Sequence, residues 1–216
     1  MERKVSFAED EYYHLYNRGV DKRTIFSSIT DYKRFLMLLY LANSTEDIRI
    51  SNILKSTTYA DVFTRERGNP LIAIGAFCLL PNHFHLLVTP LVENGISLFM
   101  LKLQTGYAMY FNTKNERSGS LFQGPFKSSH VDNDRYLYYL YSYIHLNPAK
   151  LRDPLWKDRI KSGDDLMTFV ENYPYSSYNA YLNSVHTITD PTRFPDYFSS
   201  KEEVVPHIAN WLTAEK

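Results

Sequence analysis

The hydrophobic pattern of the chain predicts four β-strands. Aromatic and β-favouring residues in YYHLYNRG indicate a strand over residues 12–19 that ends at a glycine. The apolar run LIAIGAFCLL, the turn residues Pro81-Asn82 and the run HFHLLVTP indicate two strands joined as a tight hairpin. A further short strand is expected within GSLFQGPFKSSHV.

Three segments place apolar residues at helical spacing. They are SSITDYKRFLMLLYLAN, ISLFMLKLQTGYAMYFNTKN and DNDRYLYYLYSYIHLNPAK. Gly106 interrupts the second at a cost of about 1 kcal/mol relative to alanine. The third is expected to begin at a cap among Asp132, Asn133 and Asp134 and to end before Pro148, which lacks the amide hydrogen. The order strand, helix, hairpin, helix, strand, helix predicts an α+β fold, with an antiparallel sheet and helices packed on one of its faces.

Length and composition predict a single main domain with additions. A chain of 216 residues is long enough for one sizeable core. Residues 44–69 are polar and aperiodic apart from a short apolar patch, which indicates an insertion. The final segment is more acidic, is interrupted by prolines and carries a helical pattern in VVPHIANWL. We expect a domain over residues 1–178 and a C-terminal extension over residues 179–216.

Charge and cysteine content narrow the classes of function. The net charge is zero, which argues against a protein that coats duplex DNA through many phosphate contacts. Residues 101–160 nevertheless carry 9 Lys and Arg against 5 Asp and Glu, and the 18 Tyr and 13 Phe suit stacking on nucleobases. Cys78 is the single cysteine and lies in an apolar run, so we expect a buried free thiol. With no recognisable signal peptide or membrane span, we expect a soluble cytoplasmic protein.

The stretch PNHFHLLV places His83 and His85 two residues apart on a predicted strand. Side chains alternate between the faces of a strand, so both imidazoles point the same way and can share one cation. With 7 histidines in the chain, such a pair arises by chance often enough that the pair alone is a weak motif. The position of the pair in an apolar strand strengthens the metal-binding interpretation, because burying imidazoles without partners there costs free energy.

Tyr143 and Asn147 are four residues apart on the third predicted helix and therefore share one face. A phenol beside an amide oxygen can serve as a nucleophile and a metal ligand. The alternative interpretation is a helical stripe that packs in the core, which is the usual role of a tyrosine at this spacing.

Five motifs in order, NRG, PNHFHLLVTP, GSLFQGPFKS, YIHLNPAKL and YPYSSY, run from about Tyr12 to Tyr178. This set resembles the single-tyrosine transposases of the IS200 type, and most closely their REP-associated branch. These enzymes belong to the nucleases named for a His-hydrophobic-His (HUH) motif. With the predicted elements, the resemblance indicates an α+β domain with a ferredoxin-like antiparallel sheet.

The resemblance implies a role for each residue that matches a motif. His83 and His85 would bind a divalent cation, Mg²⁺ or Mn²⁺, with Asn147 as the third ligand, and Tyr143 would be the nucleophile. The implied reaction is cleavage and rejoining of single-stranded, hairpin-forming DNA through a 5′-phosphotyrosine link, with no need for ATP. Candidate DNA contacts are Arg18, Lys127 and Lys150, whose alternative role is that of ordinary solvated charges.

The sequence leaves several points open. Gly124-Pro125-Phe126-Lys127 has Pro125 where the REP-associated branch usually has arginine, which puts one DNA contact in doubt. A non-ligand role is expected for His130 and His145, and no spacing argument applies to His14, His186 or His207. The alternatives to a transposase are a domesticated module that binds single-stranded nucleic acid and a relaxase-like or replication-initiator nickase. The protein is expected to be a monomer or a homodimer.

Overall fold

A four-stranded antiparallel sheet forms the centre of the molecule. The computed structural model describes residues 7–46, 50–156 and 163–196, together with Glu203, Val204, Pro206 and Ile208. Its strands are β1 (Tyr12–Arg18), β2 (Ile72–Leu80), β3 (His83–Pro90) and β4 (Lys127–Val131). They lie in the order β2-β3-β1-β4, and every neighbouring pair is antiparallel. The predicted α+β class and the predicted β2–β3 hairpin are confirmed.

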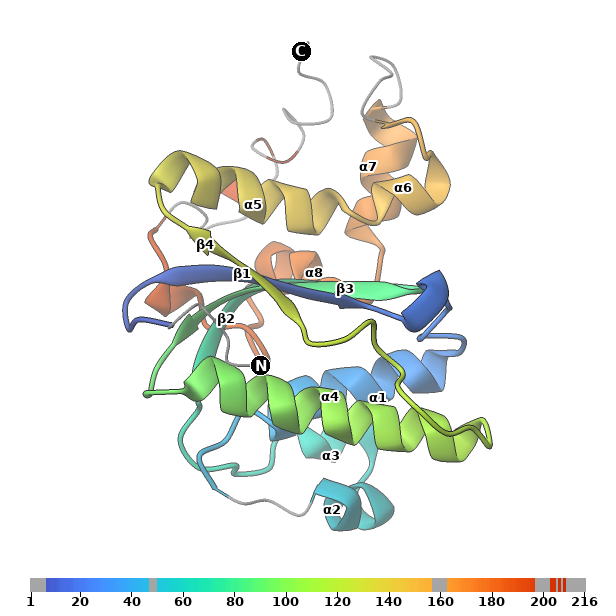
Figure 1. Cartoon of the computed structure of the whole chain (residues 1–216). Helices are drawn as coiled ribbons and strands as arrows, with labels where there is room; N and C mark the ends of the chain where they lie inside the picture. Colours follow the sequence, from blue (N-terminus) through green and yellow to red (C-terminus); the bar gives the residue numbers. More distant parts are fainter. Residues whose placement is uncertain are drawn as a thin grey trace.

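Helices cover both faces of this sheet, which corrects the prediction that they pack on one face. The long helices are α1 (Ile29–Leu41), α4 (Gly95–Lys114) and α5 (Asp134–Leu146). The short ones are η1 (Val20–Lys22), α2 (Ile50–Ser56), α3 (Tyr59–Val62), α6 (Ala149–Arg152), α7 (Gly163–Glu171), α8 (Tyr178–Asn183) and η3 (Pro191–Arg193). Figure 1 shows α1 and α4 below the sheet and α5 above it. The physical reason is that β2 is buried along its whole length, so both of its faces need cover.

Two hydrophobic cores lie on the two faces. Phe77 and Leu79 of β2 pack with side chains of α1 and α4, whereas the alternating residues Cys78 and Leu80 pack with side chains of α5 and the C-terminal segments. Cys78 is a buried free thiol, as predicted. The alternation of β2 side chains between the two cores follows from the two-residue period of a strand.

Local sequence signals set the ends of the long helices. Ser28 and Asp31 form a reciprocal capping box at the start of α1, and the Asn133 side chain accepts the Tyr136 amide at the start of α5. Helix α5 ends at Leu146, before Pro148 as predicted. Gly106 of α4 lies against α1, where an added Cβ would meet Leu38 at 3.2 Å. Close contact between α1 and α4 accounts for this glycine.

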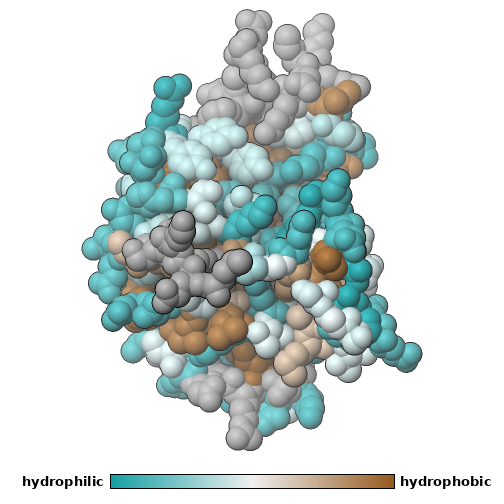
Figure 2. Space-filling view, viewed as in Figure 1, coloured by the Kyte–Doolittle hydropathy of each residue, from teal (hydrophilic) through white to brown (hydrophobic). Residues whose placement is uncertain are grey.

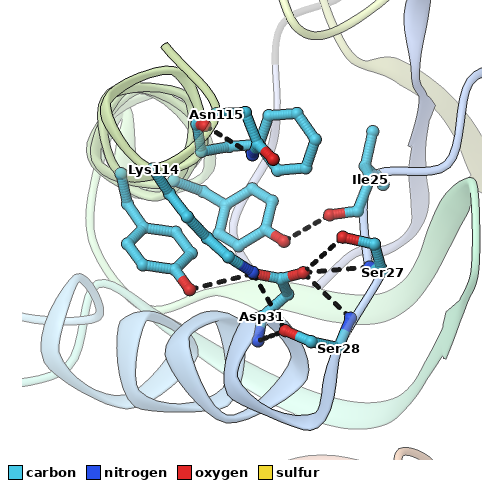
Figure 3. Close-up of polar contacts among 9 residues, drawn as sticks. Ile25, Ser27, Ser28, Asp31, Lys114 and Asn115 are labelled. Carbon is cyan, nitrogen blue, oxygen red and sulfur yellow. Dashed lines mark hydrogen bonds and ion pairs between the residues drawn. The ribbon is translucent and has the colours of Figure 1, made fainter.

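A buried carboxylate joins α1 to α4. Asp31 is fully buried and accepts hydrogen bonds from the amides of Ser27 and Ser28, the Ser27 hydroxyl, the Tyr110 hydroxyl and Lys114 Nζ (Figure 3). The loop before α1 also donates the Ile25 and Phe26 amides to the Pro81 carbonyl, in the turn that begins β3. The Asp31 cluster therefore supports the turn that carries the histidine pair.

The segment around YPYSSY covers the outer edge of β2, which is an end strand of the sheet. The Leu79 amide donates to Tyr175 O and the Ser177 amide donates to Phe77 O, both across this edge. Beyond residue 178, Tyr181 and Phe194 pack in the same core as α5. The division of the chain at residue 178 and the reading of residues 44–69 as an insertion remain predictions; α2 and α3 lie within that insertion. The predicted helix in VVPHIANWL falls mostly outside the described residues.

The surface in the view of Figure 1 is largely hydrophilic. Figure 2 shows hydrophobic residues at the level of α4, and the exposed apolar side chains of that helix are Leu98, Leu101 and Met109. Across the described part of the chain, none of the helices has both the length and the apolar character that crossing a membrane requires.

Candidate active site

The register of β1 against β3 gathers polar side chains on the face of the sheet below α5. Tyr16 lies opposite His85, and Arg18 lies opposite His83. Directly opposed residues share a face, as do alternate residues along a strand, so His14 lies on this face too. Lys127 of β4 pairs with Tyr16 and belongs to the same face.

The two histidines among the predicted metal ligands each have one ring nitrogen in contact with a neighbouring side chain. His83 Nδ1 lies 2.5 Å from Asn82 Oδ1, and His85 Nδ1 lies 2.9 Å from His14 Nε2. The rings of His83 and His85 are 5.1 Å apart at an interplanar angle of 84°. These contacts leave Nε2 of each ring for another partner. Within the described residues, His85 Nε2 is buried and has no hydrogen-bond partner.

Helix α5 brings Tyr143 and Asn147 to the histidines. The half-buried Tyr143 ring lies 5.6 Å from the His85 ring and 6.2 Å from the His14 ring, nearly perpendicular to both. Asn147 is the C-cap residue that follows α5, and its Nδ2 donates to the Tyr143 carbonyl at 2.8 Å. Asn147 Oδ1 is buried and makes no hydrogen bond to any described residue. The structure thus brings Tyr143 to the histidine pair, and Asn147 follows Tyr143 by one helical turn.

The unpartnered atoms fit a divalent cation. Buried polar atoms are nearly always hydrogen-bonded, so two such atoms in one region call for an explanation. The imidazole Nε2 of His85 and the amide oxygen of Asn147 are both metal-ligating atoms, and His83 Nε2 would add a second nitrogen. No cluster of three or more His, Cys, Asp or Glu side chains suited to a metal occurs in the described ranges. The candidate set differs from such clusters because its third member is an amide.

Burial sets the charge state of the site. It lowers the pKa of His83 to about 4, with further lowering from nearby Lys150 and Arg18, and it lowers the pKa of His14 to about 4. Burial also takes the pKa of His85 well below its ordinary value. These imidazoles are therefore neutral at pH 7, the state that binds metal. Burial raises the pKa of Tyr143 and the Asn147 side chain opposes the rise, so the phenol is protonated at neutral pH.

Three cations predicted to contact DNA lie around this site. Arg18 and Lys150 are close enough to His83 to lower its pKa, and Lys127 is exposed on β4. The NRG motif reaches its neighbours through its backbone: the Gly19 amide donates to Asn82 O, and Arg18 O accepts from the Gln123 amide. This positions Arg18 beside the turn that begins β3.

The other histidines differ in whether they contact the pair formed by His83 and His85. His145 is buried, lies 2.8 Å from the Ser177 hydroxyl and packs among tyrosines, which agrees with the expected non-ligand role. His130 pairs with Glu11 at 2.6 Å and lies opposite Tyr13, on the other face of the sheet. His186 contacts Thr189 and the Tyr181 ring, and His207 lies outside the described residues. His14 contacts His85 of the pair, and no spacing argument in the sequence indicated it.

The sheet presents His83 and His85 below the helix that carries Tyr143, which is the proximity that the sequence resemblance implied. Residues 52–147 of the chain match the family model described as "Transposase IS200 like". The matched range contains His83, His85, Tyr143 and Asn147. The resemblance predicted from the sequence motifs is confirmed.

One solved structure has a similar fold. The fold is similar to that of a REP-associated tyrosine transposase bound to a REP hairpin, with a TM-score of 0.52 and 13% sequence identity. The similarity covers 90% of this chain and 95% of the other. No match was found among curated protein sequences.

Proposed function

We propose that this protein is a metal-dependent transposase that cleaves and joins single-stranded DNA through Tyr143. The observation that carries the proposal is the proximity of the Tyr143 ring to His85, at 5.6 Å, beside two buried atoms without partners, His85 Nε2 and Asn147 Oδ1. In this proposal His83, His85 and Asn147 hold Mg²⁺ or Mn²⁺, which would neutralise charge on the scissile phosphate.

The reaction follows from the chemistry of a phenol. The Tyr143 oxygen attacks phosphorus, the bond from phosphorus to the 3′ oxygen breaks, and the 5′ phosphate stays on the tyrosine. The phenol releases its proton to solvent and the 3′ oxygen takes one up, so charge and atoms balance without ATP. A later 3′ hydroxyl reverses the step and joins a new strand. The half-buried Tyr143 ring, packed against His14 and His85, has few orientations open to it, which favours in-line attack.

The proposed substrate is a single strand that folds into a hairpin. The REP hairpin bound to the similar transposase supports this choice. Arg18, Lys127 and Lys150 would contact phosphates around the cleavage point, and a zero net charge suits such local binding better than wrapping of a long duplex. We propose a monomer or homodimer that acts in the cytoplasm.

Two other functions use parts of the same site. A nucleic-acid-binding module without transposition would use the cations and the tyrosines but would have no use for the atoms without partners. A relaxase-like or replication-initiator nickase would use the cation and Tyr143, and the match to an IS200-like transposase model favours the transposase over it. Covalent capture of DNA separates the binding module from both enzymes.

The test is formation of a covalent adduct with Tyr143. Wild-type protein, Tyr143→Phe and Tyr139→Phe are incubated with Mn²⁺ and pooled single-stranded hairpin oligonucleotides, then resolved on a denaturing gel. Tyr139 is a matched control because it is half-buried on the same helix and stacks on Tyr143 at 5.8 Å. We expect an adduct with wild-type protein and Tyr139→Phe, none with Tyr143→Phe, and none when a chelator is present.

Two outcomes count against the proposal. An adduct that persists in Tyr143→Phe places the nucleophile elsewhere. Binding of the hairpin pool by all three proteins without any adduct favours the binding module.

A further inference from the structure

A third histidine, outside the predicted ligand set, makes direct contact with it. His14 of β1 is buried, and its Nε2 lies 2.9 Å from Nδ1 of His85 on β3. The two rings are 5.0 Å apart with planes 21° from parallel, so they meet at their edges through these nitrogens. The contact joins residues 71 positions apart in the sequence.

This contact bears on which nitrogen of His85 carries the proton. A neutral imidazole has one N–H and one lone pair in the ring plane, and the partner of the first nitrogen decides the state of the second. If His14 Nε2 accepts, His85 is protonated at Nδ1, and its buried, unpartnered Nε2 keeps the lone pair that a cation needs. The opposite arrangement would place a proton on that buried Nε2, where no described group could accept it.

The contact also determines what His14 can do. His14 meets the Nδ1 edge of the His85 ring, whereas a cation would bind at Nε2 on the opposite edge. His14 therefore supports His85 from behind and is not itself in place to bind the same cation. Tyr16 packs on His14 at 5.0 Å and on His85 at 5.8 Å, and Tyr143 lies against both histidines. These rings limit rotation of either imidazole.

We propose that His14 is a positioning residue that accepts the Nδ1 proton of His85 and so fixes the tautomer and direction of this metal ligand. The inference rests on the metal site of the proposed function and is independent of the nucleophile. Metal-binding histidines generally donate their second ring N–H to an acceptor, and loss of that acceptor typically costs about 10–100-fold in metal affinity or activity. Asn82 Oδ1 has the corresponding position for His83.

The experiment compares two substitutions that remove different properties of His14. His14→Phe keeps an aromatic ring for packing but loses the acceptor, and His14→Gln keeps an acceptor near the position of Nε2 but loses the ring. Mn²⁺ binding to protein without DNA is measured by calorimetry, and long-range ¹H–¹⁵N spectra of the metal-free proteins identify the tautomer of His85. Circular dichroism checks that each variant is folded. His145→Phe is the control, because His145 is also buried but contacts Ser177 instead.

We expect the Nδ1–H tautomer of His85 in the wild-type protein and in His14→Gln. Mn²⁺ affinity should fall by about 10–100-fold in His14→Phe and by only a few-fold in His14→Gln and His145→Phe. The Nε2–H tautomer in the wild-type protein, or wild-type Mn²⁺ affinity in a folded His14→Phe, would overturn the proposal.

A wild-type protein that does not bind Mn²⁺ would also overturn it, together with the metal site. A failure of the proposed tyrosine chemistry would show in the adduct assay and not in metal binding. Metal affinity that depends on His14, without any DNA adduct, removes the proposed nucleophile and leaves the role of His14 intact.

Discussion

Replacement of Asp31 by asparagine tests whether the buried carboxylate holds α1, α4 and the preceding loop together. Its side chain is completely buried and accepts from five donors, including Lys114 Nζ at 2.6 Å. Asparagine has nearly the same shape but offers one acceptor oxygen and turns two N–H donors toward existing donors. Loss of one partner of a buried ion pair costs about 3–5 kcal/mol, and the partial exposure of Lys114 places this case near the lower end.

A loss of about 3 kcal/mol corresponds to a fall in Tm of roughly 6–12 °C for a chain of this size. The assay is denaturant unfolding of wild-type protein, Asp31→Asn and Asp21→Asn, the last being an exposed carboxylate whose loss should change stability by less than about 0.5 kcal/mol.

The dependence of folding stability on pH provides a second test of the role of Asp31. Burial alone would raise the pKa of Asp31, but hydrogen bonds from Lys114, Ser27 and Tyr110 outweigh it and hold the pKa below its ordinary value. A lowered pKa stabilises the folded state above the unfolded-state pKa of about 3.9, and the effect is lost as the pH falls toward the folded-state pKa. The stability gap between wild-type protein and Asp31→Asn should therefore be constant from pH 7 to 5 and shrink below about pH 4. A cost under about 1 kcal/mol, or a gap that does not shrink in acid, would refute the reasoning.

Two further predictions concern the site, and a third concerns the core. Asn147→Leu should lower Mn²⁺ affinity at least about tenfold, and Asn147→Asp should raise it because a carboxylate adds charge; calorimetry showing the reverse order would remove Asn147 from the ligand set. Arg18→Gln and Lys150→Gln should each reduce the slope of log K against log salt for hairpin binding by about 0.7, whereas Lys33→Gln on the opposite side of the sheet should not; equal slopes in all three variants would contradict the proposed phosphate contacts. Cys78 should resist maleimide until the protein is denatured, because it is buried and burial raises its pKa; full labelling of the folded protein would contradict this.

The strands and long helices were predictable because each carries a local signal. Strand alternation, the Asn133 cap and the stop at Pro148 depend on residues within a few positions of one another. The faces that the helices cover were predicted wrongly, although the run LIAIGAFCLL held the necessary information. A continuous apolar strand buries both of its faces, and an antiparallel sheet with one face in solvent would have alternated.

The candidate site was predictable where its residues lie within one strand or one helix. His83 with His85, and Tyr143 with Asn147, are pairs at strand and helix spacing, so each pair could be found from one element. His14 could not be found in this way, because its contact with His85 depends on the register between β1 and β3. A pattern within one strand carries no information about which residue of another strand lies beside it.

The two faces of the sheet place different demands on their polar groups. Below the sheet, Asp31 is as buried as any apolar residue, yet its carboxylate is saturated with donors, so the cluster is complete as it stands. Above the sheet, His85 Nε2 and Asn147 Oδ1 are equally hidden and lack any partner among the described residues. A folded chain tolerates such unsatisfied atoms mainly where a ligand completes them. Arg34 Nε, Gln104 Nε2 and Tyr178 OH are also buried without a hydrogen-bond partner in the described part of the chain, but the first two are N–H donors that cannot bind a cation. The lone pairs of His85 and Asn147, and not the saturated Asp31 cluster, therefore make the α5 face the place to look for chemistry.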